Sequence, residues 1–180
     1  MGKITFILGG ARSGKSSYAA ALAGRSGKRV AFIATCQGLD REMRKRIASH
    51  RRSRPPSWKT FEEPLDVRSA LKRVGPGFDV VLIDCLTLLV SNLLLGGMVG
   101  VSIEKKITEI IKELKKMRSD SIIVSNEVGL GIVPENSLAR DFRDIGGRVN
   151  QIASREADEV YFLAAGLPIK IKPSGIKGED

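Results

Sequence analysis

A glycine-rich turn near the start of the chain carries residue types that bind phosphate. In the stretch ILGGARSGKSS, residues 7–17, Gly9, Gly14, Lys15 and Ser16 fit the spacing G-x-x-x-x-G-K-[ST]. Main-chain N–H groups of such a loop surround an anion, and the next helix adds partial positive charge at its N-terminus. We expect the Lys15 ammonium to reach the β- and γ-phosphates of a nucleoside triphosphate, and the Ser16 hydroxyl to ligate Mg²⁺. The alternative is a glycine turn that fits by chance.

An aspartate at the end of an apolar run is the second candidate. Residues 79–84, DVVLID, have the pattern of a buried parallel strand with a carboxylate at its C-terminal tip. Ligands bind at that tip in open α/β sheets, so Asp84 would complete the Mg²⁺ site opposite Ser16. Asp84 could instead cap the turn that follows the strand.

The third candidate is His50, the single histidine of the chain. Neighbouring cations favour a neutral imidazole, which is a nucleophile, and they would stabilise a phosphate under attack. The alternatives are a polar surface or core histidine, a solvated basic helix face, or a contact to a nucleic-acid backbone. The basic residues around it are Arg41, Arg44, Lys45, Arg46, Arg51, Arg52 and Arg54.

Short apolar strands alternate with helices around these candidates. This alternation predicts one domain over residues 1–180, a P-loop NTPase-like three-layer α/β sandwich with a mostly parallel sheet. We expect an antiparallel edge strand at 169–172 and a loose tail at 173–180. The other predicted strands are 4–8, 29–34, 58–62, 79–84, 121–126 and 158–164, and the predicted helices are 18–23, 39–52, 65–73, 101–117 and 138–156.

Composition limits the function classes. The chain has 180 residues, 42% of them hydrophobic, and no apolar run near the roughly 18 residues of a membrane helix. We therefore expect a cytoplasmic enzyme without stable membrane insertion. The net charge of +10 indicates anionic partners, but with only 5% aromatic residues a base-stacking surface for nucleic acid is not indicated. The spacing of Cys36 and Cys85 fits neither a disulfide scaffold nor a metal site, and we interpret both as small buried residues.

Five segments together carry a resemblance to a known family. They read GGARSGKS, ATCQ, RIASHRRSRPPSWKTFEEP, LIDCLT and SNEVGLGIVPENSLARDFRDIGGRVNQ. In these segments the chain resembles the bifunctional adenosylcobinamide kinase/adenosylcobinamide-phosphate guanylyltransferase family of cobalamin biosynthesis. The resemblance covers residues 4–172. The H-R-x-x-R-P-x-x-W-x-T-x-E and N-E-V-G-x-G-I-V-P segments are not general features of P-loop proteins.

The resemblance implies two reactions and a set of site residues. A phosphoryl group would pass from ATP or GTP to adenosylcobinamide, and His50 would then carry GMP from GTP to adenosylcobinamide-phosphate. It also implies a homotrimer. Family members often have Ser at the position of Cys36 and Glu at that of Asp84. The implied nucleotide site consists of Gly9, Gly10, Ala11, Arg12, Ser13, Gly14, Lys15, Ser16, Ala34, Thr35, Cys36, Arg51, Arg52, Ser53, Arg54, Glu62 and Asp84.

Two other functions compete with this interpretation. A P-loop kinase for another small molecule would not need His50. A nucleotide-dependent protein that binds nucleic acid would use the basic helix on a phosphate backbone, with a steep salt dependence. Nucleotide bound covalently to the protein would distinguish the bifunctional enzyme from both.

Overall fold

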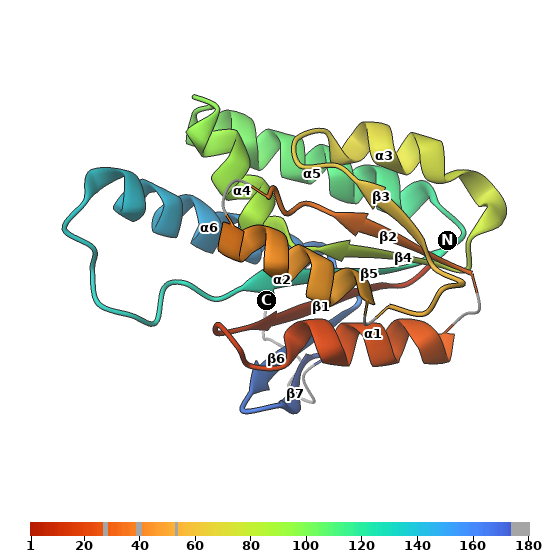
Figure 1. The fold of residues 1–180 in the computed structure, drawn as a ribbon. Helices are drawn as coiled ribbons and strands as arrows, with labels where there is room; N and C mark the ends of the chain where they lie inside the picture. The colour runs from red at the N-terminus through yellow and green to blue at the C-terminus, as the bar shows by residue number, and fades with distance from the viewer. Residues whose placement is uncertain (27–28, 39–40, 53, 174–180) are drawn as a thin grey trace.

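The computed structural model describes residues 1–26, 29–38, 41–52 and 54–173. Strands and helices alternate along most of the chain, as predicted (Figure 1). The elements are β1 (Ile4–Gly9), α1 (Lys15–Ser26), β2 (Val30–Ala34), α2 (Arg41–Arg52), β3 (Lys59–Glu62), α3 (Val67–Val74), β4 (Val80–Asp84), α4 (Leu86–Leu95), α5 (Gly100–Lys116), β5 (Asp120–Asn126), α6 (Ser137–Glu156), β6 (Glu159–Ala164) and β7 (Leu167–Lys172), with a short 3-10 helix at Gly75–Gly77.

Seven strands of the described chain form one sheet in the order β3-β2-β4-β5-β1-β6-β7. All neighbouring pairs are parallel except β6 and β7, which are antiparallel. The predicted three-layer α/β fold, its mostly parallel sheet and its antiparallel edge strand are therefore confirmed. The tail predicted for 173–180 lies outside the described residues from 174 onward.

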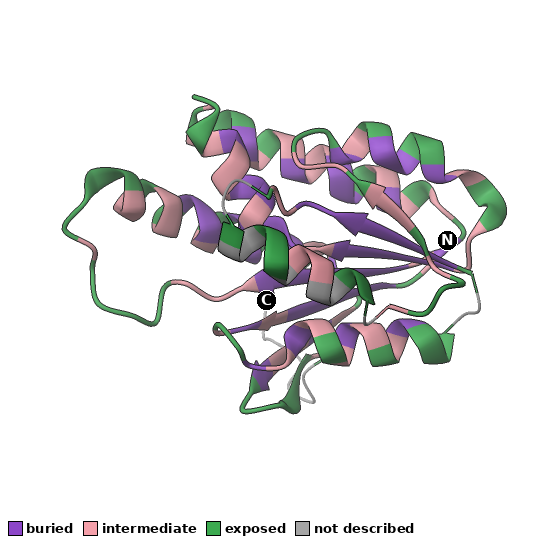
Figure 2. Cartoon of the chain, in the orientation of Figure 1, coloured by how far each residue is buried: buried purple, intermediate pink, exposed green. Residues whose placement is uncertain are grey.

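The apolar core lies on both faces of this sheet. One face packs against α3, α4, α5 and α6, and the other packs against α1 through Ala19 and Ala23. Buried residues concentrate in the central strands and on the helix sides that face them (Figure 2). The apolar stripe predicted for the helix at 101–117 is confirmed, because its members in α5 are all buried: Ile103, Ile107, Ile110, Ile111 and Leu114.

Helix α4 was not predicted from the sequence. Its sequence, LTLLVSNLLL, is apolar nearly all round and so lacks the stripe that marks a surface helix. The structure packs it against β5, α5 and α6, and buries Leu86, Leu89, Val90 and Leu93. No helix in the described parts of the chain is both long enough and apolar enough to cross a membrane.

The parallel strands bring their C-terminal ends to one edge of the sheet. Gly9 at the end of β1 is in register with Asn126 at the end of β5. Ala34 at the end of β2 is in register with Asp84 at the end of β4. The segments after these strands, which include the phosphate loop, therefore meet at the edge where α/β sheets bind ligands.

Candidate nucleotide-binding site

The loop between β1 and α1 has the backbone of a phosphate-binding turn. Arg12 and Gly14 have positive φ angles of 56° and 90°. A side chain at Gly14 would be strained by this φ and would bring its Cβ to 3.2 Å from the Cα of Gly166. The Gly166 N–H also donates to the Ser13 carbonyl at 3.0 Å, which ties the loop to the β6–β7 turn. The positive φ and the close approach of Gly166 explain why glycine suits position 14.

Lys15 is the first residue of α1 and is 7% exposed. Its ammonium donates to the Gly10 carbonyl at 2.5 Å and to Ser13 Oγ at 3.4 Å. Both acceptors belong to the loop itself, so the positive charge lies across the turn that the motif predicts to hold phosphate.

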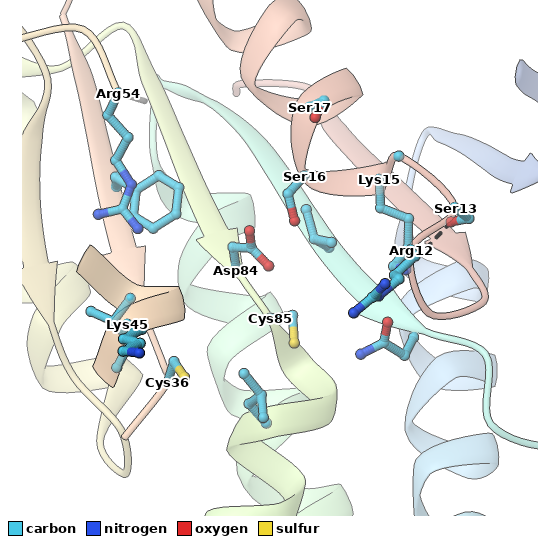
Figure 3. Close-up of a pocket in the computed structure, with 16 residues that line it drawn as sticks. Arg12, Ser13, Lys15, Ser16, Ser17, Cys36, Lys45, Arg54, Asp84 and Cys85 are labelled. Atoms are coloured by element: carbon cyan, nitrogen blue, oxygen red, sulfur yellow. Dashed lines mark hydrogen bonds between the residues drawn. The ribbon is translucent and has the colours of Figure 1, made fainter. Parts of the chain in front are cut away.

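A cavity of about 730 Å³ opens beside the loop (Figure 3). Its walls come from the loop, α1, β2, α2, β4, α4 and β5, and it therefore lies at the shared C-terminal edge of the sheet. Residues of the predicted nucleotide site that line it are Arg12, Ser13, Gly14, Lys15, Ser16, Cys36, Arg54 and Asp84.

Other residues of the predicted set lie near the cavity without lining it. Thr35 is fully buried, and its hydroxyl joins the main chain of Cys85 through two hydrogen bonds of 2.8 Å. Arg51 and Glu62 form an exposed ion pair at 3.6 Å that links the end of α2 to the end of β3. Ser53 lies outside the described residues, and of His50 the structure describes only the main chain, within α2. The remaining residues that do not line the cavity are Gly9, Gly10, Ala11, Ala34 and Arg52.

Half of the cavity wall was missed in the sequence. Asn126 could have been found, because it ends a buried strand as Asp84 does. Lys45 and Ile47 reach the cavity only because α2 lies over it, and no local pattern predicts that placement. The lining residues outside the predicted set are Ser17, Phe32, Lys45, Ile47, Cys85, Leu88, Val124 and Asn126.

The charges that line the cavity suit a polyanion. Arg12 and Lys15 lie on one side of the cavity in Figure 3, and Lys45 and Arg54 lie on the other. Asp84 is the single acidic residue among the described lining residues. Four cations against one carboxylate favour a triphosphate over a neutral or cationic ligand.

Ser16 and Asp84 have the chemistry of a magnesium site. Both line the cavity, and their oxygen atoms point toward the same space in Figure 3. The Asp84 carboxylate also faces a cation, because its charge acts on the Arg54 guanidinium. A protein typically supplies only one or two oxygen ligands to Mg²⁺, and phosphate oxygens and water complete the coordination. The Ser16 hydroxyl and the Asp84 carboxylate fit this pattern. The described chain holds no cluster of three or more His, Cys, Asp or Glu side chains that could bind a metal alone.

Arg54 is held in the cavity by an aromatic side chain. Its guanidinium carbon lies 3.5 Å from the ring centroid of Phe32, which in turn stacks on Trp58 with centroids 6.4 Å apart. The guanidinium also donates to Thr60 Oγ1 at 3.2 Å. Burial lowers the pKa of Arg54, while the charge of Asp84 acts in the opposite direction. The guanidinium stays protonated, because an arginine pKa begins far above neutral.

The two cysteines differ in their surroundings. Cys85 is buried as predicted, and this burial raises the pKa of its thiol to about 12. Cys36 is partly exposed, so its interpretation as a buried residue was wrong: it follows β2 at the sheet edge, where the cavity opens. Both thiols line the cavity.

The fold and the cavity together define a P-loop nucleotide-binding protein. A mostly parallel sheet presents a G-x-x-x-x-G-K-S loop, the Asp84 carboxylate and several cations at its C-terminal edge. Comparison with known proteins identifies the family. Residues 5–171 match the model of the family described as cobinamide kinase / cobinamide phosphate guanyltransferase, and the chain belongs to that family. The resemblance inferred from the sequence is therefore confirmed.

Three curated relatives support this membership, each 42% identical over 92% of this chain. Two are named "Bifunctional adenosylcobalamin biosynthesis protein CobU", from Escherichia coli and Salmonella typhimurium, and the match covers 98% of each. The third, from Pseudomonas aeruginosa, is named "Bifunctional adenosylcobalamin biosynthesis protein CobP", and the match covers 95% of it. The kinase and nucleotidyltransferase activities predicted from the sequence are those of the family.

Proposed function

We propose that this chain phosphorylates adenosylcobinamide and then converts adenosylcobinamide-phosphate to adenosylcobinamide-GDP. The phosphoryl donor is ATP or GTP, and the GMP donor is GTP, which releases pyrophosphate. Membership of the family and the names of the three relatives support the two activities and the pathway. The observation that carries the proposal is the cationic cavity in which the phosphate loop, Asp84 and α2 meet.

In the kinase reaction, the hydroxyl oxygen of the aminopropanol arm forms a bond to the γ-phosphorus, and the bond from that phosphorus to the β-phosphate oxygen breaks. The hydroxyl proton passes to solvent. Lys15 and Arg12 would balance the charge on the triphosphate as the phosphoryl group moves. Mg²⁺ held by Ser16 and Asp84 would neutralise the charge that builds up on the β- and γ-phosphate oxygens.

In the transferase reaction, we assign the nucleophile to His50. An imidazole nitrogen attacks the α-phosphorus of GTP, a P–N bond forms, and pyrophosphate leaves. A phosphate oxygen of adenosylcobinamide-phosphate then attacks the same phosphorus and releases the imidazole. The assignment rests on the H-R-x-x-R-P motif and on the position of His50 in α2, one helical turn after Ile47 of the cavity wall.

Further parts of the proposal come from the family resemblance. Arg51, Arg52, Ser53 and Glu62 would line the nucleotide site. The chain would act as a homotrimer in the cytoplasm. The many cations of α2 support the contact with the nucleotide, since this helix contributes Lys45 to the cavity wall.

The decisive experiment follows the α-phosphate of GTP. Wild-type protein incubated with Mg²⁺ and α-labelled GTP should retain label through denaturation, and acid should remove it because a phosphoramidate is labile in acid. GTP labelled at the γ-phosphate is the matched control and should leave no label, since that phosphate departs in pyrophosphate.

The variant His50→Ala should never acquire label, while its kinase activity persists because phosphoryl transfer to a hydroxyl does not use this nucleophile. Label that survives acid, or label on the variant, would overturn the assignment of His50. Wild-type protein that takes up no label at all would favour a kinase for another small molecule or a regulatory nucleotide-binding protein.

A further inference from the structure

A closed ring of hydrogen bonds lies at the C-terminal end of β5. Ser125 Oγ lies 2.7 Å from Asn150 Oδ1, an atom that only accepts, so the serine hydroxyl must donate to it. Thr87 Oγ1 is 3.0 Å from Ser125 Oγ and therefore supplies the proton of that contact. Asn150 Nδ2 donates to the Asn126 carbonyl at 3.0 Å, and the Asn126 N–H donates to Thr87 Oγ1 at 2.6 Å. Each of the four contacts thus has one donor and one acceptor.

This ring joins three elements inside an otherwise apolar region. Thr87 belongs to α4, Ser125 to β5 and Asn150 to α6, and the three residues are 6%, 1% and 5% exposed. Buried polar groups are costly unless they are hydrogen-bonded, so these four contacts together favour one geometry. The ring fixes the main chain of Asn126, because it bonds both the N–H and the C=O of that residue.

The side chain of Asn126 is left for another purpose. Asn126 lines the cavity, and its amide makes no hydrogen bond with any described residue. Neither polar atom of that amide is among the buried unpartnered atoms of the described chain. A main chain fixed from two sides thus presents an accessible amide, with two N–H donors and one carbonyl acceptor, to the cavity.

The position of Asn126 indicates which phosphate it meets. β5 lies between the strand that leads to the phosphate loop and the strand that ends in Asp84. Asn126 is in register with Gly9, and the Lys15 ammonium lies against the next residue, Gly10. The lysine of this motif reaches the β- and γ-phosphates, so Asn126 lies at the terminal-phosphate end of the cavity.

We infer that the side-chain amide of Asn126 donates a hydrogen bond to the γ-phosphoryl group of the bound nucleoside triphosphate, and that Thr87, Ser125 and Asn150 are positioning residues that hold it there. The inference rests on the proposed function only in assigning the cavity to a nucleoside triphosphate. A neutral amide adds a directed donor beside Lys15 without changing the charge of the site.

The test compares GTP with GDP, because GDP lacks the group that Asn126 contacts. The probes are GTP and GDP with Mg²⁺, titrated into the full chain by calorimetry. Asn126→Ala should weaken GTP binding about tenfold or more and leave GDP binding nearly unchanged, as expected for loss of one hydrogen bond to a charged group. Asn126→Asp keeps the shape of the side chain and should weaken GTP binding further, because a carboxylate repels the γ-phosphate.

The ring is tested by a matched pair at position 87. Thr87→Val keeps the shape of the side chain but removes its hydroxyl. Like Asn126→Ala, it should lower the preference for GTP over GDP. Thr87→Ser restores the hydroxyl and should restore the preference. The control is Asn136→Ala, which removes the N-cap of α6 outside the cavity and should leave the preference intact.

Equal loss of GTP and GDP binding in both Asn126 variants, or no loss in either, would overturn the inference. A thermal melt of each variant separates misfolding from lost contact, and Asn126→Asp keeps the test valid if Asn126→Ala folds poorly. The result is independent of corrinoid turnover. Wild-type protein that prefers GTP but phosphorylates no cobinamide would contradict the proposed function and not this contact.

Discussion

Replacing Phe32 by leucine should weaken nucleotide binding through Arg54. The Phe32 ring is 5% exposed and lies 3.5 Å below the guanidinium carbon, while Arg54 is partly buried. A desolvated cation–π contact of this kind contributes about 2 kcal/mol, and an exposed one about 0.5–1 kcal/mol. Leucine keeps an apolar side chain without the ring quadrupole. We therefore expect a loss of about 1–2 kcal/mol in GTP binding, or roughly 5- to 30-fold in Kd.

A double-mutant cycle separates positioning of Arg54 from direct contact between the ring and the nucleotide. The cycle compares wild type, Phe32→Leu, Arg54→Ala and the double variant, with Kd for GTP measured by calorimetry. If the Phe32 side chain acts by holding the Arg54 guanidinium, either substitution should weaken GTP binding only a little further once the other has been made. The coupling free energy should then be about 1 kcal/mol or more. Additive effects, within about 0.3–0.5 kcal/mol, would refute the reasoning.

Phe61→Leu is the matched control for this cycle. Phe61 also faces a cation, with Lys59 Nζ 5.3 Å from its ring centroid, but neither residue lines the cavity. The same chemical change there should lower the melting temperature through lost packing against Phe78 and leave the Kd for GTP unchanged. An equal loss of GTP binding in this variant would mean that aromatic truncation acts through stability alone.

Three further predictions concern other residues of the cavity. Lys15→Ala should abolish both activities, since both begin from a triphosphate in the same loop; normal GTP affinity and turnover in this variant would contradict the site. Asp84→Asn should raise the Mg²⁺ concentration needed for half-maximal turnover with little change in the thermal melt, and an unchanged metal requirement would leave Asp84 a structural cap. Iodoacetamide should modify Cys36 of the native protein, and GTP should protect it. Cys85 should stay unmodified at pH 8, because burial raises the pKa of its thiol and keeps it in the unreactive protonated form; mass spectrometry of the labelled peptides measures both.

Local sequence patterns predicted those parts of the fold that depend on a regular period. The apolar stripe of α5 and the continuous apolar run of β4 are such patterns, and both elements formed within a residue or two of the predicted limits. α4 has no such period, because it is buried on most of its surface. Its helical state follows from packing against β5, α5 and α6, which a local pattern does not contain.

The cavity residues likewise divide into those that a local pattern predicts and those that depend on how distant elements pack. The phosphate loop and Asp84 were predicted because chain order and strand ends determine where they lie. Phe32 faces the cavity from within a strand whose residues are all buried, so alternation gave no indication of it. Lys45 and Ile47 depend on how α2 crosses the sheet edge, and the ring through Asn150 depends on three elements that meet only in the folded chain.

The arrangement of cations gives a physical reason why one cavity could serve both activities of the family. Phosphoryl transfer concentrates charge at the terminal phosphates, near Arg12 and Lys15 of the phosphate loop. In the transferase reaction that we propose, attack at the α-phosphorus would leave two anions, GMP on the protein and pyrophosphate, and one group of cations would not hold them apart. Lys45 and Arg54 supply a second group on the opposite side, with Ser16 and Asp84 between the two (Figure 3). A kinase alone would need only the first group, so the proposed transferase reaction would account for the basic character of α2.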